Sequence, residues 1–274
     1  MRYRTIGDVE VSAIGLGAMP LSIEGRPDRD RAIATIHAAL DAGVTLIDTA
    51  DSYHWHADEI GHNEELISAA LAVHSGADAV LVATKGGRGR PGDGSWTVTG
   101  TPAHLKNACE GSLKRLGVDA IGLYQLHKPD ENVPWAESVG AIKELADEGK
   151  IRLAGISNVS RAQILEAREI LGETLVSVQN EHAPAHLVHE PELALCTELG
   201  LAYLPWGPLR GIGAEFQAVA EEHGVSPQRV CLAWLLAKSP SMIAIPGSTR
   251  PATIRDSAAA ADLVLTDADL ARLP

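Results

Sequence analysis

The sequence alternates eight times between a short apolar run and a longer segment with helical spacing. The apolar runs, which we expect to form strands, are residues 12–17, 45–49, 79–85, 120–127, 151–157, 176–181, 202–206 and 242–246. The predicted helices are residues 29–42, 63–74, 102–116, 134–148, 160–171, 191–199, 213–223 and 251–261, with one extra helix at 227–238. Eight strand–helix units without a linker predict an α/β fold, a (β/α)8 TIM barrel that occupies residues 1–274 as a single domain.

The segment before the barrel and one competing architecture complete the fold prediction. Residues 3–11, with Gly7 and Asp8 near the middle, are typical of a small N-terminal β-hairpin. A doubly wound open sheet is the alternative, and it usually binds a nucleotide through a glycine-rich first turn. Gly15 and Gly17 lack the third glycine of that motif, so the sequence favours the closed barrel.

Charge and cysteine content exclude several classes of protein. The net charge of −13, from 36 acidic and 23 basic residues, disfavours nonspecific binding to nucleic acid or to anionic membranes. The odd number of cysteines, three, without CxxC spacing argues against a disulfide framework or a zinc site. We therefore expect a cytoplasmic protein without a metal, and no apolar run is long enough to span a bilayer.

Four chemically useful side chains lie at or just after the ends of predicted strands. Asp48, Lys85 and His127 end the second, third and fourth strands, and Tyr53 follows Asp48 in the next loop. Taken singly, each has an ordinary structural explanation, such as a turn former, a solvated lysine, a hydrogen-bonded histidine or a packed tyrosine. In a barrel, however, the carboxyl ends of the strands share one mouth, where catalytic groups gather. The four residues therefore predict one catalytic site.

The motifs around these residues resemble the aldo-keto reductase family, and in particular its bacterial members. The matching segments are DTADSY, LVATKGG, GSLKRLGVDAIGLYQLHKPD, GISNVS and IPGSTRP, and the similarity runs over about residues 14–257. The resemblance implies that Tyr53 donates a proton to a substrate carbonyl while Lys85 lowers the pKa of Tyr53. It also implies that Asp48 pairs with Lys85 and that His127 orients the carbonyl oxygen.

The same resemblance implies a nicotinamide dinucleotide, NADPH by preference with NADH possible, because the hydride must come from a cofactor. Ser157, Asn158 and Gln179 are then expected to hold the nicotinamide carboxamide, and Trp206 to stack on its ring in place of the family's usual tyrosine. Ser248 and Arg250 are expected to bind the 2′-phosphate at a helix N-terminus. The remaining expected cofactor contacts are Gly17, Gly207, Leu209 and Asp256.

The substrate is expected to be a small carbonyl compound. Met19, His54, Trp55 and Trp96 are the candidate pocket residues, and the glycine-rich segment 86–101 is long enough to cover the mouth. Two alternatives to a reductase are a cofactor-binding regulatory protein with little turnover and an aldolase or isomerase that uses Lys85 as a Schiff-base amine. The second would leave Arg250, Gln179 and Trp206 unexplained.

Overall fold

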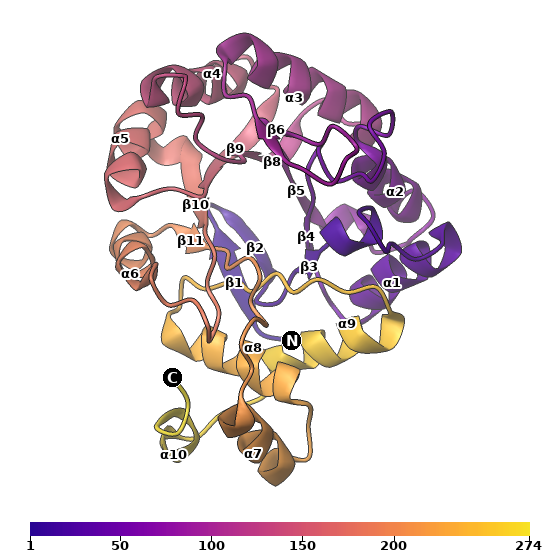
Figure 1. Ribbon diagram of the computed structural model, residues 1–274, viewed down its shortest axis with the longest axis vertical. Coiled ribbons are helices and arrows are strands. Elements are labelled where there is room, and N and C mark those ends of the chain that lie inside the picture. Colours follow the sequence, from indigo (N-terminus) through magenta and orange to yellow (C-terminus); the bar gives the residue numbers. More distant parts are fainter.

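The computed structural model, which describes residues 1–274, contains a curved parallel sheet that runs through most of the chain (Figure 1). Its strands lie in the order β11-β10-β9-β8-β5-β4-β3, so neighbours in sequence are neighbours in the sheet. Their bounds are β3 Leu16–Gly17, β4 Leu46–Asp48, β5 Leu81–Gly86, β8 Ile121–Leu126, β9 Ile151–Ser157, β10 Leu175–Gln179 and β11 Ala202–Tyr203. Every pair in this sheet is parallel, as a chain of βα units requires.

The segment predicted as the eighth strand closes this sheet into a barrel. Met242 bridges Tyr203 of β11, and Ala244 bridges Ile14 just before β3. These contacts are isolated bridges rather than a continuous ladder, and Pro246 has no backbone N–H to extend them. The predicted barrel is thus confirmed, with its last strand less regular than expected.

The helices lie around the outside of the barrel, most of them against its strands and two, at residues 214–223 and 267–270, farther out (Figure 1). They are α1 Arg29–Asp41, α2 His62–Leu71, α3 Pro102–Leu116, α4 Trp135–Asp147, α5 Arg161–Leu171, α6 Glu190–Leu199, α7 Ala214–His223, α8 Pro227–Lys238, α9 Pro251–Ala258 and α10 Asp267–Leu270. Short 3-10 turns occupy Met19–Leu21, Ala77–Ala79, Gly172–Thr174 and Ala259–Ala261. None of the helices combines the length and the apolar character needed to cross a membrane.

Local sequence fixes many of the helix ends. Ser160 forms a capping box with Gln163 before α5, which satisfies donors that the first helical turn leaves free. Prolines stand in the first turn of α3, α6, α8 and α9, where a missing N–H has no cost. These signals explain why most helices were predicted within a few residues.

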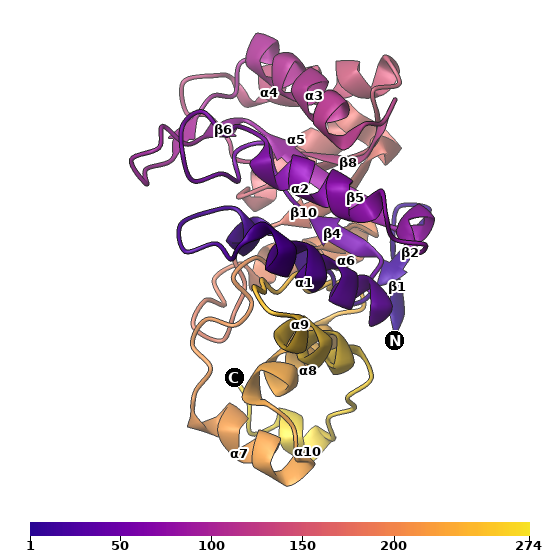
Figure 2. The same cartoon turned by 90° about the vertical axis from the view of Figure 1, so that its right-hand side faces the viewer.

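An antiparallel hairpin closes the amino-terminal end of the barrel. Its strands are β1 Tyr3–Ile6 and β2 Val9–Ser12, as the sequence predicted. Ile6 and Val11 belong to a cluster of apolar residues that includes Leu46 and Leu123 from the barrel strands. Figure 2 shows this hairpin at the opposite end of the barrel from the long loop that carries β6 (Arg88–Gly89). Any site in this barrel therefore opens at the carboxyl ends of the strands.

The long glycine-rich segment after β5 contains a small hairpin that the sequence did not predict. Its strands, β6 Arg88–Gly89 and β7 Thr97–Val98, pair in antiparallel register. Each strand has only two residues, which is too short for an alternating pattern to reveal. The hairpin gives a fixed course to a segment that was expected only to cover the mouth.

Candidate active site

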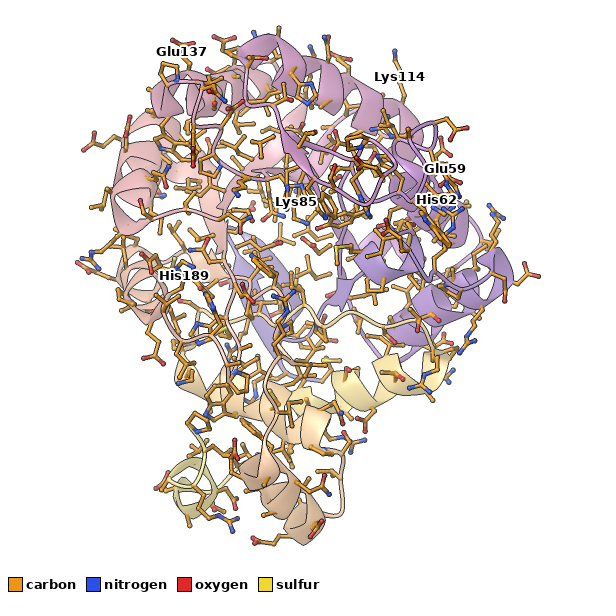
Figure 3. All side chains as sticks on the ribbon, viewed as in Figure 1. Glu59, His62, Lys85, Lys114, Glu137 and His189 are labelled. Atoms are coloured by element: carbon orange, nitrogen blue, oxygen red, sulfur yellow. The ribbon has the colours of Figure 1, made fainter.

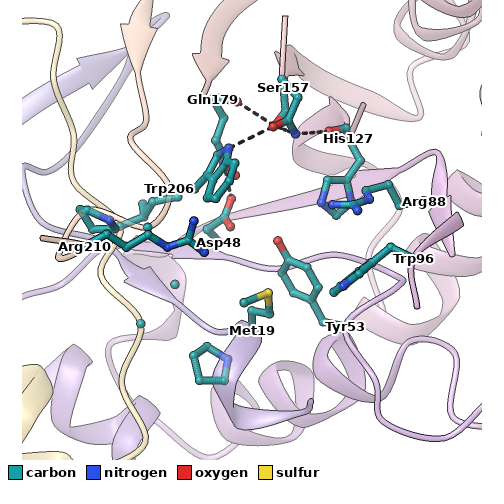
Figure 4. A pocket seen from close by; sticks show the side chains of 17 residues that line it. Met19, Asp48, Tyr53, Arg88, Trp96, His127, Ser157, Gln179, Trp206 and Arg210 are labelled. Atoms are coloured by element: carbon teal, nitrogen blue, oxygen red, sulfur yellow. Dashed lines mark hydrogen bonds between the residues drawn. The ribbon is translucent and has the colours of Figure 1, made fainter. Parts of the chain in front are cut away.

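A cavity of about 420 Å³ opens at the carboxyl end of the barrel (Figure 4). Its walls come from nearly every strand end and from the loops that follow. The lining residues are Gly17, Met19, Pro20, Asp48, Tyr53, Arg88, Trp96, His127, Ser157, Asn158, Gln179, Trp206, Gly207, Pro208, Arg210, Ile245 and Gly247. Three of the four predicted catalytic residues line it, and the fourth, Lys85, lies directly beneath them.

Lys85 is fully buried near the axis of the barrel (Figure 3) and connects two of these residues. Its Nζ donates hydrogen bonds to Asp48 Oδ1 at 2.6 Å, to Tyr53 Oη at 3.0 Å and to the backbone oxygen of Thr49 at 2.8 Å. All three ammonium protons therefore have partners, which a buried cation requires. The ammonium can hold a phenolate or donate to a phenol at the same place.

Asp48 is also held by two barrel amides. Gln179 Nε2 donates to Asp48 Oδ2 at 2.8 Å, and Gln125 Nε2 donates to the same oxygen at 3.2 Å. The carboxylate thus accepts from Lys85 on one oxygen and from two amides on the other. This network fixes the position of Asp48 beside Lys85.

The pKa values of Tyr53 and Lys85 agree only in part with the prediction from the sequence. Burial raises the pKa of Tyr53; Lys85 acts in the opposite direction, and Asp48 again raises it. Lys85 therefore stabilises the phenolate as expected but does not bring the pKa of Tyr53 below its ordinary value. Burial disfavours the charge of Lys85, yet Asp48 and Tyr53 outweigh it and raise the pKa of this lysine. Tyr53 is consequently protonated and Lys85 charged near neutral pH.

His127 lies beside Tyr53, with the two ring centroids 5.7 Å apart and the rings nearly perpendicular. Burial, together with the charges of Lys85 and Arg88, lowers the pKa of His127 well below its ordinary value. The imidazole is therefore neutral, with one nitrogen as donor and the other as acceptor. Its Nδ1 is buried and has no hydrogen-bond partner within the chain.

The residues expected to contact nicotinamide form one connected group across the cavity from Tyr53 (Figure 4). Ser157 Oγ donates to the backbone oxygen of Gln179 at 2.7 Å, and Asn158 Nδ2 donates to Ser157 Oγ at 3.1 Å. Trp206 Nε1 donates to Asn158 Oδ1 at 3.1 Å. Asn158 is the one non-glycine residue with positive φ, at 60°, a conformation that asparagine tolerates.

Two glycines allow the backbone to pass close to this group. A side chain at Gly17 would place Cβ 2.6 Å from the backbone oxygen of Ile245, where the barrel closes. Gly207 has φ of 64°, in the left-handed region that favours glycine. Both residues line the cavity, and their contact with a cofactor stays a prediction.

The expected phosphate-binding segment lies at the start of α9. Arg250 is the N-cap residue and is exposed, and its guanidinium has no ion-pair partner. Ser248 Oγ accepts a hydrogen bond from the Arg250 backbone N–H at 3.3 Å, which fixes the turn. Asp256, in contrast, is occupied by Arg229 through hydrogen bonds of 2.5 and 3.1 Å and by Ser226. Asp256 is thus already bonded within the chain, and its contact with the cofactor stays a prediction.

Like Asp256, the predicted contacts Ser248 and Arg250 do not line the cavity, and neither do Leu209, His54 and Trp55. Leu209 packs against the large apolar cluster between the barrel and its helices. His54 is buried, and its Nδ1 lies 2.7 Å from the backbone oxygen of His56. Trp55 stacks on His56 with ring centroids 5.2 Å apart. The chain turns sharply after Tyr53, so His54 and Trp55 face away, whereas Met19 and Trp96 line the cavity as expected.

Three arginines near the cavity were not predicted. Arg88 and Arg210 line it, and Arg90 lies beside Trp96. The guanidinium carbons of Arg88 and Arg90 are each 4.5 Å from the centroid of the Trp96 ring. Arg88 and Arg90 are two residues apart, and such positions share one face of an extended chain. This spacing was the sequence signal that could have placed both beside one site.

A second group of buried ionisable side chains lies close to the four predicted catalytic residues, Asp48, Tyr53, Lys85 and His127. Glu64 is fully buried and accepts hydrogen bonds from Arg115 Nε at 2.6 Å and from Thr84 Oγ1 at 2.5 Å. Asp51 is also buried, and its Oδ1 has no hydrogen-bond partner. Burial and the negative charge of Glu64 raise the pKa of Asp51 to about 8. One arginine thus compensates two buried carboxyl groups only in part.

Comparison with known proteins supports the resemblance seen in the sequence motifs. The family model described as "Aldo/keto reductase family" matches residues 13–214 and 211–274. The chain belongs to the aldo/keto reductase family. It is an NAD(P)H-dependent oxidoreductase, and the resemblance to bacterial members is confirmed.

Individual relatives of this aldo/keto reductase cover nearly its full length. Pyridoxine 4-dehydrogenase from Escherichia coli is 35% identical over 284 residues, which cover 98% of this chain and 96% of that protein. A glycerol dehydrogenase from Gluconobacter oxydans superposes with a TM-score of 0.84 at 29% identity, covering 97% and 92% of the two chains. An aldo/keto reductase from Klebsiella pneumoniae in complex with NADP and acetate gives 0.81 at 27% identity, with coverage of 98% and 93%.

Proposed function

We propose that this aldo/keto reductase reduces an aldehyde or ketone to an alcohol, with NADPH as the hydride donor and Tyr53 as the proton donor. The observation that carries the proposal is the buried Lys85 ammonium, which lies within hydrogen-bond distance of both Asp48 and Tyr53. A buried cation beside a phenol stabilises the phenolate that remains after proton transfer. The phenol oxygen faces a cavity large enough for a small molecule.

The protonation states support a general-acid role. Burial keeps Tyr53 protonated, so it holds a proton to give, while the charge of Lys85 lowers the cost of giving it. His127 is neutral and can donate one hydrogen bond to a carbonyl oxygen without competing for the proton. Asp48 holds Lys85 in place and keeps it charged. In the oxidative direction the same phenolate would accept the proton from an alcohol.

The opposite wall of the cavity fits a nicotinamide ring. When bound, the cofactor would supply the hydride that no side chain can provide. Ser157, Asn158 and Gln179 would hold its carboxamide, because each retains hydroxyl or amide groups at the cavity wall. Trp206 offers an aromatic face on the same side.

The preference for NADPH rests on the start of α9. Arg250 is an exposed cation at a helix N-terminus, where the backbone N–H groups also attract anions. A 2′-phosphate would satisfy both features, whereas NADH has no such group. An NADP complex of the Klebsiella pneumoniae relative is consistent with this preference.

A wider assignment follows from the same features. We propose that residues 1–274 form one domain, because strands from both ends of the chain bridge each other where the barrel closes. We also propose a cytoplasmic location, since the three cysteines are buried and unpaired, as in reducing compartments.

The decisive experiment follows nicotinamide absorbance when the purified protein is mixed with NADPH and a panel of aldehydes and ketones. Consumption of NADPH with formation of the alcohol is expected for at least one carbonyl. NADPH binding without turnover of any carbonyl would instead favour a regulatory protein on this fold. Tyr53→Phe should keep NADPH binding and lose about 100-fold or more in kcat, since a general acid typically contributes that much.

A further inference from the structure

One cation in the cavity wall has no partner in the protein. Arg90 forms an ion pair with Glu24, and Arg210 forms one with Glu181. The guanidinium of Arg88 makes no hydrogen bond or ion pair, and its Nε is buried without an acceptor. The chain has 36 acidic residues, yet none of them compensates the charge of this half-buried arginine, and its N–H donors have no acceptor in the protein.

Arg88 is nevertheless held in a defined position. Its backbone belongs to β6 and pairs with Val98 of β7. Its guanidinium carbon lies 4.5 Å from the centroid of Trp96, a distance typical of a cation–π contact. Arg90 lies at the same distance from that ring, and Glu24 compensates its charge. The hairpin therefore keeps Arg88 preorganised rather than free in solvent.

The position of Arg88 is close to the reacting groups. Trp96 lies 6.4 Å from Tyr53 and 6.5 Å from His127 between ring centroids. Figure 4 shows Arg88 beside His127 and Trp96, across the cavity from Gln179 and Trp206. An incoming carbonyl at Tyr53 and His127 would thus have Arg88 on the side away from the proposed nicotinamide wall.

We propose that Arg88 binds an anionic group, a carboxylate or a phosphate, carried by the carbonyl substrate a few bonds from the reacting carbon. This inference rests on the proposed reduction and specifies its substrate class. The planar guanidinium can form two parallel hydrogen bonds to either anion, and the unpartnered Nε supplies one of the donors. The net charge of −13 repels anions at long range, so a local cation is needed to select them.

The test compares matched pairs of aldehydes with NADPH. For a carboxylate, 4-carboxybenzaldehyde is compared with its neutral ester, methyl 4-formylbenzoate; for a phosphate, glyceraldehyde 3-phosphate is compared with glyceraldehyde. The measured quantity is the ratio of kcat/KM for the anionic and the neutral member of each pair. We expect the wild-type protein to favour the anionic member of at least one pair, and the pair that shows the preference identifies the anion.

Substitutions of Arg88 separate its charge from its packing. Arg88→Met keeps an unbranched apolar chain beside Trp96 and should reduce the preference by about 10- to 100-fold, the value of a charge-assisted hydrogen bond. Arg88→Lys should retain part of the preference, because it keeps the charge but loses the paired donors. Arg210→Met removes the same charge from the same cavity and serves as the matched control, for which we expect the ratio to persist.

The outcomes distinguish this inference from the proposed function. If no carbonyl is reduced at all, the reductase proposal itself is wrong. If neutral aldehydes are reduced but neither anionic member is preferred, only the role of Arg88 is refuted. Equal losses of preference in Arg88→Met and Arg210→Met would also refute it, because they would show a general effect of positive charge. If Arg88→Met does not fold, the ratio of kcat/KM for the anionic and the neutral aldehyde is compared between Arg88→Lys and Arg210→Met. A lower ratio in Arg88→Lys supports the role of Arg88, and equal ratios refute it.

Discussion

Replacing Asp51 with asparagine should stabilise the protein, and by more as the pH rises. The carboxyl group of Asp51 is buried, its Oδ1 has no hydrogen-bond partner, and Glu64 adds a like charge nearby. Asparagine has nearly the same shape and carries no charge. The substitution therefore removes the ionisation of Asp51 while leaving its packing in place.

The magnitude follows from the pKa of this group. Burial, as the largest cause, raises the pKa of Asp51 from 3.8 to about 8. The folded protein then holds a proton that the unfolded chain releases, so the stability present below pH 3.8 is lost as the pH rises toward about 8. About four pKa units at 1.36 kcal/mol each set an upper limit of roughly 6 kcal/mol, which local relaxation reduces.

The assay is urea denaturation of wild type and Asp51→Asn at several pH values between 4 and 9. The difference in unfolding free energy should be small near pH 4, grow through the neutral range and level off above pH 8. Asp58→Asn is the matched control, because Asp58 is exposed in the same loop and its replacement removes no buried charge. A stability gain that does not change with pH, or that shrinks as the pH rises, would refute the reasoning.

Three further substitutions test the site and the barrel. Lys85→Met should raise the pKa of Tyr53 further and leave Asp48 without a cationic partner. We expect a loss in kcat of about 100-fold or more. A pH–rate profile with the wild-type shape would argue against the coupling of Lys85 to Tyr53. Arg250→Ala should weaken the binding of NADPH by about tenfold or more and that of NADH little, as measured by fluorescence titration. Equal losses of affinity for the two cofactors would contradict a 2′-phosphate contact. Gly17→Ala should destabilise the protein by about 1–3 kcal/mol, because its Cβ would meet the backbone of Ile245 where the barrel closes; Gly140→Ala is the control, since nothing lies near its Cβ and alanine favours a helix interior.

The barrel could be predicted because its signals are local and repeated. Strand ends such as Asp48 and Ser157 coincide with the ends of apolar runs. The Ser160 cap and the proline at the first position of α8, Pro227, mark helix starts. Since parallel strands place their carboxyl ends at one mouth of the barrel, the order of the strands alone predicted that the four catalytic residues lie together. The short helix α10 was missed because four residues are too few for a periodic pattern.

The direction of loop side chains could not be predicted in the same way. His54 and Trp55 follow Tyr53 directly, yet the turn after Tyr53 points them away from the cavity. Arg88 lies in the cavity because an irregular glycine-rich segment folds back as a hairpin. The direction in which the pKa of Tyr53 shifts also depends on burial, which raises this pKa by more than the charge of Lys85 lowers it. The extent of burial is known only from the fold in three dimensions.

The hairpin at the amino-terminal end of the barrel bears on how the site recovers its proton. Ile6 and Val11 pack among apolar barrel residues, so apolar side chains fill this end of the barrel below Lys85. If Tyr53 gives up its proton as proposed, the replacement must come through the open mouth, which the product and the cofactor also use. Reprotonation and product departure then share one route, so slowing the exit of a bulky alcohol should also delay recovery of the acid.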